Sequence, residues 1–369
     1  MKEVYNFDEF GIPSWLLLLF WLLYVVVFAY TFRKTMLPSL RNKQSSDVTK
    51  WFLLFFTLFA VFYCINADYF RYRDWIYGRD FTFWTKEKIY VYIILFCRSL
   101  PFDYPFEVFR FIIWGGAVLI AYHTFQMYRG KVLPGLTVVF LFVLYSGTFC
   151  YARASLAMAV YFFGIALYLL YKQPLIRFLG IGIAVSSYLF HHEMLIGLVI
   201  LPCIFLPFEK KGFSILSIVL VMVVAIVLSH FSSIQEIVNT VFDSDELSEK
   251  VEDINDKEQR AFRLSTLISY LCFYYPIYLI ARNFWKKYVP LSIKGMYRIS
   301  FAIVMASIAL MIITGIRSVY TYRVLYIAMI PISLITCYCY NNGDFKKRQL
   351  LIILILALLA NSVRLVNHY

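Results

Sequence analysis

The sequence has few charged residues for a chain of its length. Of its 369 residues only 15% are charged, whereas 62% are hydrophobic and 20% are aromatic. A soluble protein carries about 25% charged and about 45–50% apolar residues. So few charges could not cover the surface that a folded chain of this length exposes to water. The composition therefore excludes soluble enzymes, disordered chains and solenoids, and it indicates a membrane protein.

Several chemical signatures are also missing. The 7 cysteines form no C-x-x-C motif and lie in or beside apolar runs, so neither a disulfide framework nor a zinc site is predicted. The sequence contains no glycine-rich phosphate loop and no dinucleotide fingerprint, so no nucleotide site is expected. The net charge of +13 fits the cytoplasmic excess of Lys and Arg in multispan proteins, and nucleic acid is not an expected partner.

Long apolar runs are what the sequence has in abundance. About twelve runs are long enough to cross roughly 30 Å of hydrocarbon as helices. They lie at 14–32, 50–65, 108–127, 132–149, 154–171, 178–191, 194–208, 212–231, 265–281, 299–316, 322–340 and 349–362. A shorter apolar piece at 89–97 is followed by Arg98 and two prolines, so we expect a re-entrant or interfacial half-helix there. The predicted fold is all-α, a polytopic membrane protein with a single integral membrane domain over residues 1–369.

The loop charges predict which side of the membrane each loop faces. Lys and Arg gather on alternate loops, for example at Arg33–Lys34 and Lys210–Lys211. By the positive-inside rule these loops are cytoplasmic, so both termini are expected to be extracytoplasmic. The two longest polar segments then lie outside: residues 66–107, which include the half-helix, and the acidic segment 232–264. Long loops on a rigid scaffold commonly carry the functional residues.

Ionisable residues collect at the ends of the runs that face outward. Charged groups at membrane depth are costly and mark functional sites. Arg153 is the clearest case, because almost no loop separates the two apolar runs beside it. Several cations at one leaflet boundary could bind an anionic headgroup, since arginine binds phosphate oxygens bidentately. The alternative for any single arginine is that it only reaches water at the bilayer surface.

A histidine pair, His191 and His192, opens another tight outer turn and is followed by Glu193. An imidazole can accept a proton from a sugar hydroxyl, as a glycosyl transfer to an alcohol requires. Two adjacent residues on a helix cannot both point inward, so we expect one of the two histidines at most to be a base. A membrane-interface histidine without a catalytic role is the alternative.

Aromatic rings alternate with charges in the segment 68–77. Such a surface could bind carbohydrate, because rings stack on the apolar face of a pyranose while polar groups contact its hydroxyls. Aromatic belts at the bilayer surface are the alternative explanation.

A series of motifs, in order along the chain, resembles the EpsG-like members of the Wzy-type bacterial polysaccharide polymerases. The motifs are Asp68-Tyr69-x-x-Tyr72, the acidic Glu87, Arg153-x-x-x-Ala157, Phe190-His191 before an apolar run, and Arg323-x-x-Tyr326 leading to Pro331. Three positions depart from the family pattern: no arginine precedes the first motif, Ala154 replaces a glutamine and Glu193 replaces a small serine.

The resemblance implies a GT-C-like helical membrane enzyme of the bacterial cytoplasmic membrane. Such an enzyme joins polyprenyl-diphosphate-linked oligosaccharide repeat units into O-antigen, capsular polysaccharide or exopolysaccharide on the outer face. A chain-length regulator and a flippase are the partners that the resemblance implies. No cofactor is expected, because the energy already lies in the glycosyl diphosphate bond. A divalent metal could share the leaving-group role but is not favoured where arginines are available.

Together, the residues and the resemblance assign a role to each candidate. The catalytic candidates are His191 as base, Asp68 as the second candidate for base, and Arg153. The expected ligands of the leaving diphosphate are Arg153, Arg317 and Arg323. The expected saccharide contacts are Tyr69, Tyr72, Arg73, Trp75, Glu87 and Tyr326. No metal ligands are assigned, and Asp243 and Asp245, whose spacing could chelate a metal, are expected to belong to a solvated acidic face.

Two other functions remain open from the sequence. A GT-C glycosyltransferase could move one sugar from a polyprenyl monophosphate, with Asp68 as base or metal ligand. A flippase for lipid-linked oligosaccharide would not be an enzyme; transporters of that kind place broken helices near the midplane and tend toward internal repeats, which are not evident here.

Overall fold

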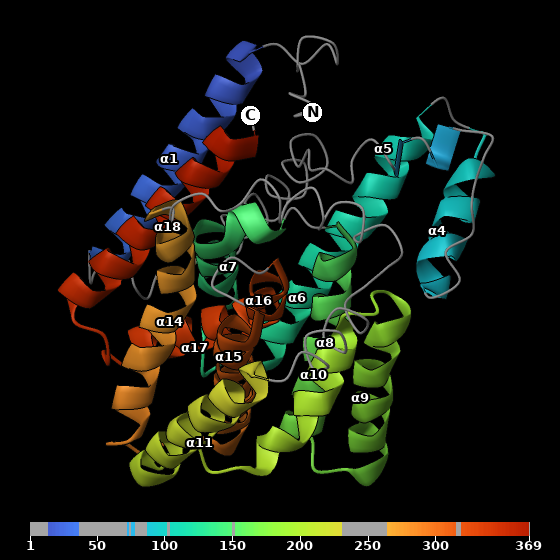
Figure 1. Cartoon of the computed structure of the whole chain (residues 1–369). Helices are drawn as coiled ribbons and strands as arrows, with labels where there is room; N and C mark the ends of the chain where they lie inside the picture. The colour runs from blue at the N-terminus through green and yellow to red at the C-terminus, as the bar shows by residue number, and fades with distance from the viewer. Residues whose placement is uncertain are drawn as a thin grey trace. The chain divides into compact units, whose positions relative to one another are not determined.

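The described part of the chain is built from helices. The computed structural model describes residues 14–36, 72, 73, 75–77, 87–101, 104–149, 152–230, 264–314 and 319–368. Within these ranges there is no strand, and one isolated bridge joins Arg129 and Val132 (Figure 1). The all-α prediction is confirmed for these residues. The predictions for Asp68, Tyr69, Arg317 and the acidic segment up to residue 263 lie outside them.

The chain divides into two compact units, Met1–Met194 with Ser333–Tyr369, and Leu195–Ile332. The first unit contains α1 (Ser14–Met36), α4 (Lys88–Arg98), α5 (Pro105–Arg110), the π-helical turn η3 (Phe111–Gly115), α6 (Gly116–Met127), α7 (Pro134–Phe149), α8 (Ala152–Leu170), α9 (Pro174–Ser186), the 3-10 turn η4 (Ser187–Leu189) and α18 (Lys347–His368). The second contains the 3-10 turn η5 (Leu201–Phe205), α11 (Lys211–Ser229), α14 (Leu264–Phe284), α15 (Leu291–Thr314) and α16 (Val319–Ile327). The boundaries between the units fall in α10 (Met194–Ile200) and α17 (Met329–Asn341).

Four helical stretches among the described residues are long and apolar enough to cross a membrane. They are Pro105–Met127, Arg153–Leu170, Lys211–Ser229 and Leu291–Thr314. A fifth crossing results if α16 and α17 form one span, which bends by 50° at the break between them. Pro331 accounts for the bend, because it has no N–H to donate to the carbonyl one turn earlier.

The predicted runs and the observed helices agree better in position than in length. The predicted half-helix at 89–97 is α4, and the predicted runs within the described residues are helical. Four of them correspond to apolar helices shorter than a full crossing: Leu22–Thr31, Pro134–Tyr145, Pro174–Leu189 and Met194–Phe205. The last two end in 3-10 turns, where prolines or the histidine turn interrupt regular hydrogen bonding. The count of about twelve spans and the GT-C-like architecture stay predictions.

Within the first unit, α8 packs against both α6 and α9 (Figure 1). The contact with α9 is a backbone contact between glycines. A Cβ atom on Gly180 would lie 2.6 Å from the Gly164 carbonyl oxygen, and a Cβ atom on Gly164 would overlap the Gly180 carbonyl oxygen. Small residues let helix backbones approach closely and gain dispersion contacts, which is how helices associate in lipid.

A second group in this unit consists of α1, α7 and α18, which contact one another. The backbone of α7 is non-helical at Tyr145, and the nearby carbonyl of Val143 accepts hydrogen bonds from side chains instead. The Tyr24 hydroxyl donates to this carbonyl at 3.1 Å, and Asn361 Nδ2 donates to it at 3.0 Å. These buried bonds join three helices that are distant in sequence.

In the second unit, Arg298 on α15 holds the connection that precedes α11. Its Nε and Nη2 atoms donate to the two oxygens of Glu209 at 2.9 and 2.6 Å, and its Nη1 atom donates to the Ile204 carbonyl at 2.9 Å. This is the bidentate geometry in which arginine and carboxylate pair most strongly. Burial alone would raise the pKa of Glu209, but the hydrogen bonds from Arg298 hold it below its ordinary value.

The glycine contact can be tested on a single helix. We expect Gly180→Ala to lower the stability of the purified protein by about 1–3 kcal/mol, because the added methyl group cannot fit against α8. The matched control is Gly182→Ala on the same helix, where nothing lies within 4 Å of an added Cβ. Thermal unfolding in detergent measures both. Equal midpoints for the two variants would show that α8 and α9 do not need the close approach.

Candidate functional site

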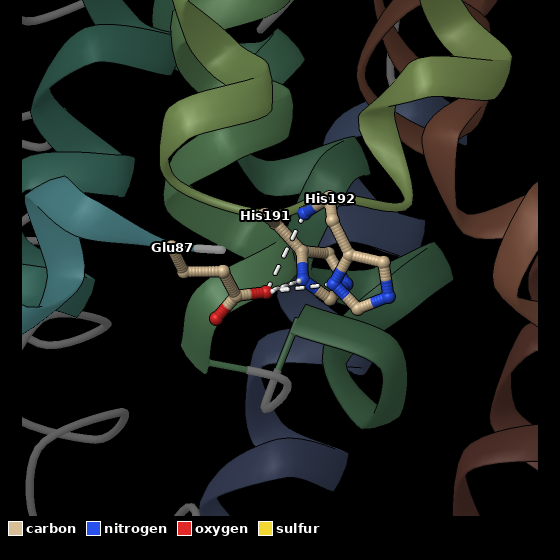
Figure 2. A group of neighbouring side chains, drawn as sticks. All are labelled: Glu87, His191 and His192. Carbon is tan, nitrogen blue, oxygen red and sulfur yellow. Dashed lines mark hydrogen bonds and ion pairs between the residues drawn. The ribbon is translucent and has the colours of Figure 1, made fainter. Parts of the chain in front are cut away.

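Five polar side chains from three separate segments meet around one buried carboxylate. Glu87 immediately precedes α4, and Arg153 lies in the first turn of α8. His191, His192 and Glu193 form the turn between η4 and α10. All five belong to the first unit, and Figure 2 shows the Glu87 carboxylate pointing at both histidine rings.

The Glu87 carboxylate accepts a hydrogen bond from each of three side chains. Its Oε1 atom lies 2.8 Å from His191 Nδ1 and 3.1 Å from His192 Nδ1. Its Oε2 atom lies 2.8 Å from Arg153 Nη1. On the far side of the His191 ring, Nε2 lies 3.0 Å from Glu193 Oε2. His191 is therefore held between two carboxylates.

Local backbone structure explains why these side chains converge. Glu87 is the N-cap residue of α4, but its side chain makes no capping bond and reaches across to the histidine turn instead. In that turn the His191 N–H donates to the Ser187 carbonyl at 3.1 Å, and the His191 carbonyl accepts from Met194 N–H at 3.0 Å. The two adjacent histidines lie in a turn and not on a regular helix, so both rings reach the same oxygen. The expectation that only one could point inward was wrong for this reason.

An aromatic cluster packs beside Arg153. The Arg153 guanidinium lies 5.8 Å from the ring centre of Tyr72, within the range of a cation–π contact. Tyr72 is only 1% exposed and contacts the rings of Trp75, Tyr90 and Phe109 at 5.4, 5.6 and 5.9 Å. Tyr90 lies one turn after Glu87 on α4. The same helix thus supplies a carboxylate for Arg153 and a ring to the cluster that packs against it.

A comparison with known protein families identifies the family of this chain. The sequence model of the EpsG family matches residues 49–367. The chain belongs to the EpsG family. The resemblance inferred from the motifs is confirmed, and membership is consistent with a polysaccharide polymerase, which is a glycosyltransferase. Neither a curated protein nor a solved structure matches the chain. Glu87 and the four residues around it all lie within the EpsG match.

The charges in this EpsG site compensate one another. Burial alone would raise the pKa of Glu87, but Arg153 and the hydrogen bonds from the histidines hold it well below its ordinary value. Burial alone would lower the pKa of His191, but Glu193 and Glu87 raise it to about 9. At neutral pH the Glu87 carboxylate is therefore ionised and His191 is an imidazolium, beside the Arg153 guanidinium.

The same residues include a group that could hold a metal ion. Glu87, His191 and His192 each offer one ligand atom, and these atoms lie within 4.8 Å of one another. A glutamate and two histidines are a ligand set that divalent zinc accepts, and Glu193 occupies the position of a carboxylate that orients a ligating histidine. Arg153 opposes a second cation here, because its own charge already pairs with Glu87. The absence of a metal cofactor stays a prediction.

The structure places the other predicted residues in several environments. Arg73 is exposed, and Trp75 is 9% exposed beside Tyr72. Arg323 and Tyr326 lie on α16 in the second unit, where Tyr326 is largely buried with its ring 6.4 Å from that of Phe273. Of the predicted site residues that the structure describes, Glu87, Arg153 and His191 therefore lie together, and Tyr72 and Trp75 lie beside them.

Sequence reasoning gave no site role to two members of the cluster. His192 was considered with His191 as a pair of which one at most would be a base, and Glu193 was noted as the residue after the pair and as a departure from the family pattern. The signal that could have revealed them is the run of two histidines and a glutamate in one tight turn, because consecutive polar groups in an apolar chain need partners.

The proton on His191 makes the stability of this EpsG protein depend on pH. The folded-state pKa of His191 is raised to about 9. Its protonated ring therefore stabilises the folded protein in full below the ordinary pKa of about 6.5, and this stabilisation is lost as pH rises through about 9. We expect the melting temperature of the purified protein to fall over this window. His191→Gln should melt lower at neutral pH and lose this pH dependence.

Thermal unfolding at closely spaced pH values measures the effect. His230→Gln is the control, because His230 is exposed at the end of α11 and, among the described residues, its ring bonds to a carbonyl of its own helix. An unchanged alkaline slope in His191→Gln would show that another group causes the pH dependence.

Proposed function

We propose that this EpsG-family protein is a Wzy-type polymerase, a glycosyltransferase that joins lipid-linked oligosaccharide repeat units. The observation that carries the proposal is the buried cluster around Glu87, in which a guanidinium and an imidazolium lie beside groups that can exchange protons. Such a cluster at the ends of apolar helices suits a substrate with an anionic headgroup and a hydrocarbon tail.

The proposed donor is a growing glycan on polyprenyl diphosphate, in bacteria undecaprenyl diphosphate. The proposed acceptor is the non-reducing end of a second lipid-linked repeat unit. Negative charge builds on the diphosphate as it leaves, and a fixed positive charge at that point stabilises the transition state. Arg153 is the proposed ligand of this group, with the His191 imidazolium 2.8 Å from the same carboxylate adding a second positive charge. Arg317 and Arg323 are proposed as further ligands.

The predicted role of His191 as base changes in this proposal, since each ring nitrogen of His191 faces a carboxylate oxygen. His191 acts instead as a charged, positioning group. Asp68 remains a proposed base. Glu87, first expected to contact saccharide, is proposed to hold Arg153 and the two histidines in place.

The proposed saccharide path includes Tyr69, Arg73, Trp75 and Tyr326. The exposed Arg73 follows the buried Tyr72, which suggests a surface whose rings are held from inside while polar groups face the glycan. Tyr72 contributes by packing against Arg153.

The proposed location is the outer face of the bacterial cytoplasmic membrane, with both termini extracytoplasmic. The four to five candidate spans and the family membership support a membrane protein. A flippase that delivers the repeat unit and a regulator of chain length are the proposed partners.

The reaction can be tested with purified protein in detergent and a defined polyprenyl-diphosphate oligosaccharide, without nucleotide sugar. We expect a ladder of products spaced by whole repeat units. Arg153→Ala should reduce polymer at least about 100-fold, because one charge-stabilising donor is lost. Gel and mass analysis of the released glycan measure both results.

The matched control is Arg129→Ala, which removes an exposed arginine between α6 and α7 and should leave the ladder unchanged. Products that grow by one sugar from a polyprenyl monophosphate donor would instead establish the single-sugar transferase. Normal polymer from a well-folded Arg153→Ala protein would remove Arg153 from the mechanism.

A further inference from the structure

The two histidines beside Glu87 differ in what surrounds their rings. Both nitrogens of His191 lie within hydrogen-bond distance of a carboxylate. In His192, Nδ1 lies 3.1 Å from Glu87 Oε1, whereas Nε2 is buried and has no hydrogen-bond partner among the described residues. The His192 side chain as a whole is 15% exposed, although its Nε2 atom is buried.

This difference determines which nitrogen of His192 carries a lone pair. An ionised carboxylate only accepts hydrogen bonds, so the neutral ring of His192 places its hydrogen on Nδ1, toward Glu87. The Nε2 atom then carries the lone pair and acts as a proton acceptor. The His192 backbone N–H also faces Glu87 Oε1, at 3.4 Å. A carboxylate that fixes the tautomer and the orientation of a histidine is the arrangement found where a histidine acts as a general base.

We propose that His192 is the general base that accepts the proton of the acceptor hydroxyl. This inference rests on the proposed function and assigns the role of base to His192, whereas the motifs favoured its neighbour His191. A buried polar atom without a partner is costly, and an acceptor hydroxyl bound at Nε2 would supply the missing hydrogen bond.

The proposed step transfers one proton and one glycan. The acceptor O–H bond breaks and its proton moves to His192 Nε2, while the oxygen electron pair forms a bond to the anomeric carbon of the donor glycan. The bond between that carbon and the diphosphate oxygen breaks, and the leaving polyprenyl diphosphate takes the electron pair beside Arg153 and His191. The proton on His192 then passes to water, which restores the neutral ring.

Glu87 connects the two halves of this step. One oxygen of Glu87 orients His192 and the other holds Arg153. The proton acceptor, His192, and the ligand of the leaving group, Arg153, are therefore held at a fixed separation by one carboxylate. A sugar ring beside this carboxylate would present its acceptor-facing and leaving-group sides to different residues, as an in-line transfer requires.

The test compares His192→Ala and His192→Gln with the wild type in the polymerisation assay of purified protein. We expect both variants to lose about 100-fold or more in kcat with little change in KM. Added imidazole should restore part of the rate to His192→Ala, and the restored rate should follow the fraction of imidazole that is unprotonated. A structural role would not produce such rescue. His230→Ala is the matched control and should retain wild-type activity.

A second measurement does not depend on activity. In protein labelled with 15N-histidine, His192 should show a protonated Nδ1 and an unprotonated Nε2, whereas His191 should be protonated at both nitrogens. The signals are assigned by comparison with His192→Gln and His191→Gln.

Three results would overturn the inference. His192→Gln could retain the wild-type kcat, or His192 could carry its hydrogen on Nε2. Alternatively, zinc or manganese could restore activity to a chelator-treated wild type and bind less tightly to His192→Ala, which would make His192 a metal ligand. A wild type that makes no polymer from a matching repeat unit, although its histidines show the expected protonation, would instead contradict the proposed function itself.

Discussion

The buried Glu87 carboxylate is the group on which the site depends. Its side chain is 2% exposed, and an isolated ionised carboxylate at such a position would be strongly destabilising. It is tolerated because a guanidinium and two imidazoles surround it. The second carboxylate, Glu193, then balances the charge of His191. Removal of any one member would leave another buried charge without compensation, so the cluster is expected to behave as a unit.

The helix pair α8 and α9 explains how residues distant in sequence reach this carboxylate. The two helices run antiparallel and are joined by a short connection, so the N-terminus of α8 and the C-terminus of α9 lie at the same end of the pair (Figure 1). α8 has 19 residues, and α9 with η4 spans nearly the same length. Arg153 and the histidine turn therefore lie at the same position along the axis of the helix pair. The glycine contact holds the two helices close together.

The site also shows how one element can supply both charge and packing. Glu87 and Tyr90 are one turn apart at the start of α4, where their side chains share a face. Glu87 pairs with Arg153, while Tyr90 packs on Tyr72, whose ring lies beside the same guanidinium. The position of Arg153 is thus determined twice, by an ion pair and by an aromatic contact. For an arginine in the first turn of a helix this matters, because the helix dipole disfavours a positive charge there.

The sequence alone determined the membrane class, the helical fold, the positions of most helices and the EpsG family, because apolar runs and local motifs are properties of neighbouring residues. It also identified Arg153, His191 and Glu87 as functional candidates. Only the tertiary structure decided which residues contact one another and which are buried. It places Glu87 at the centre of the cluster, buries Tyr72, and adds His192 and Glu193 to the site. These contacts join residues up to 105 positions apart, and the angle of a turn decides whether two adjacent rings face one oxygen. The spacing of residues along the chain predicts neither long-range packing nor the geometry of a turn.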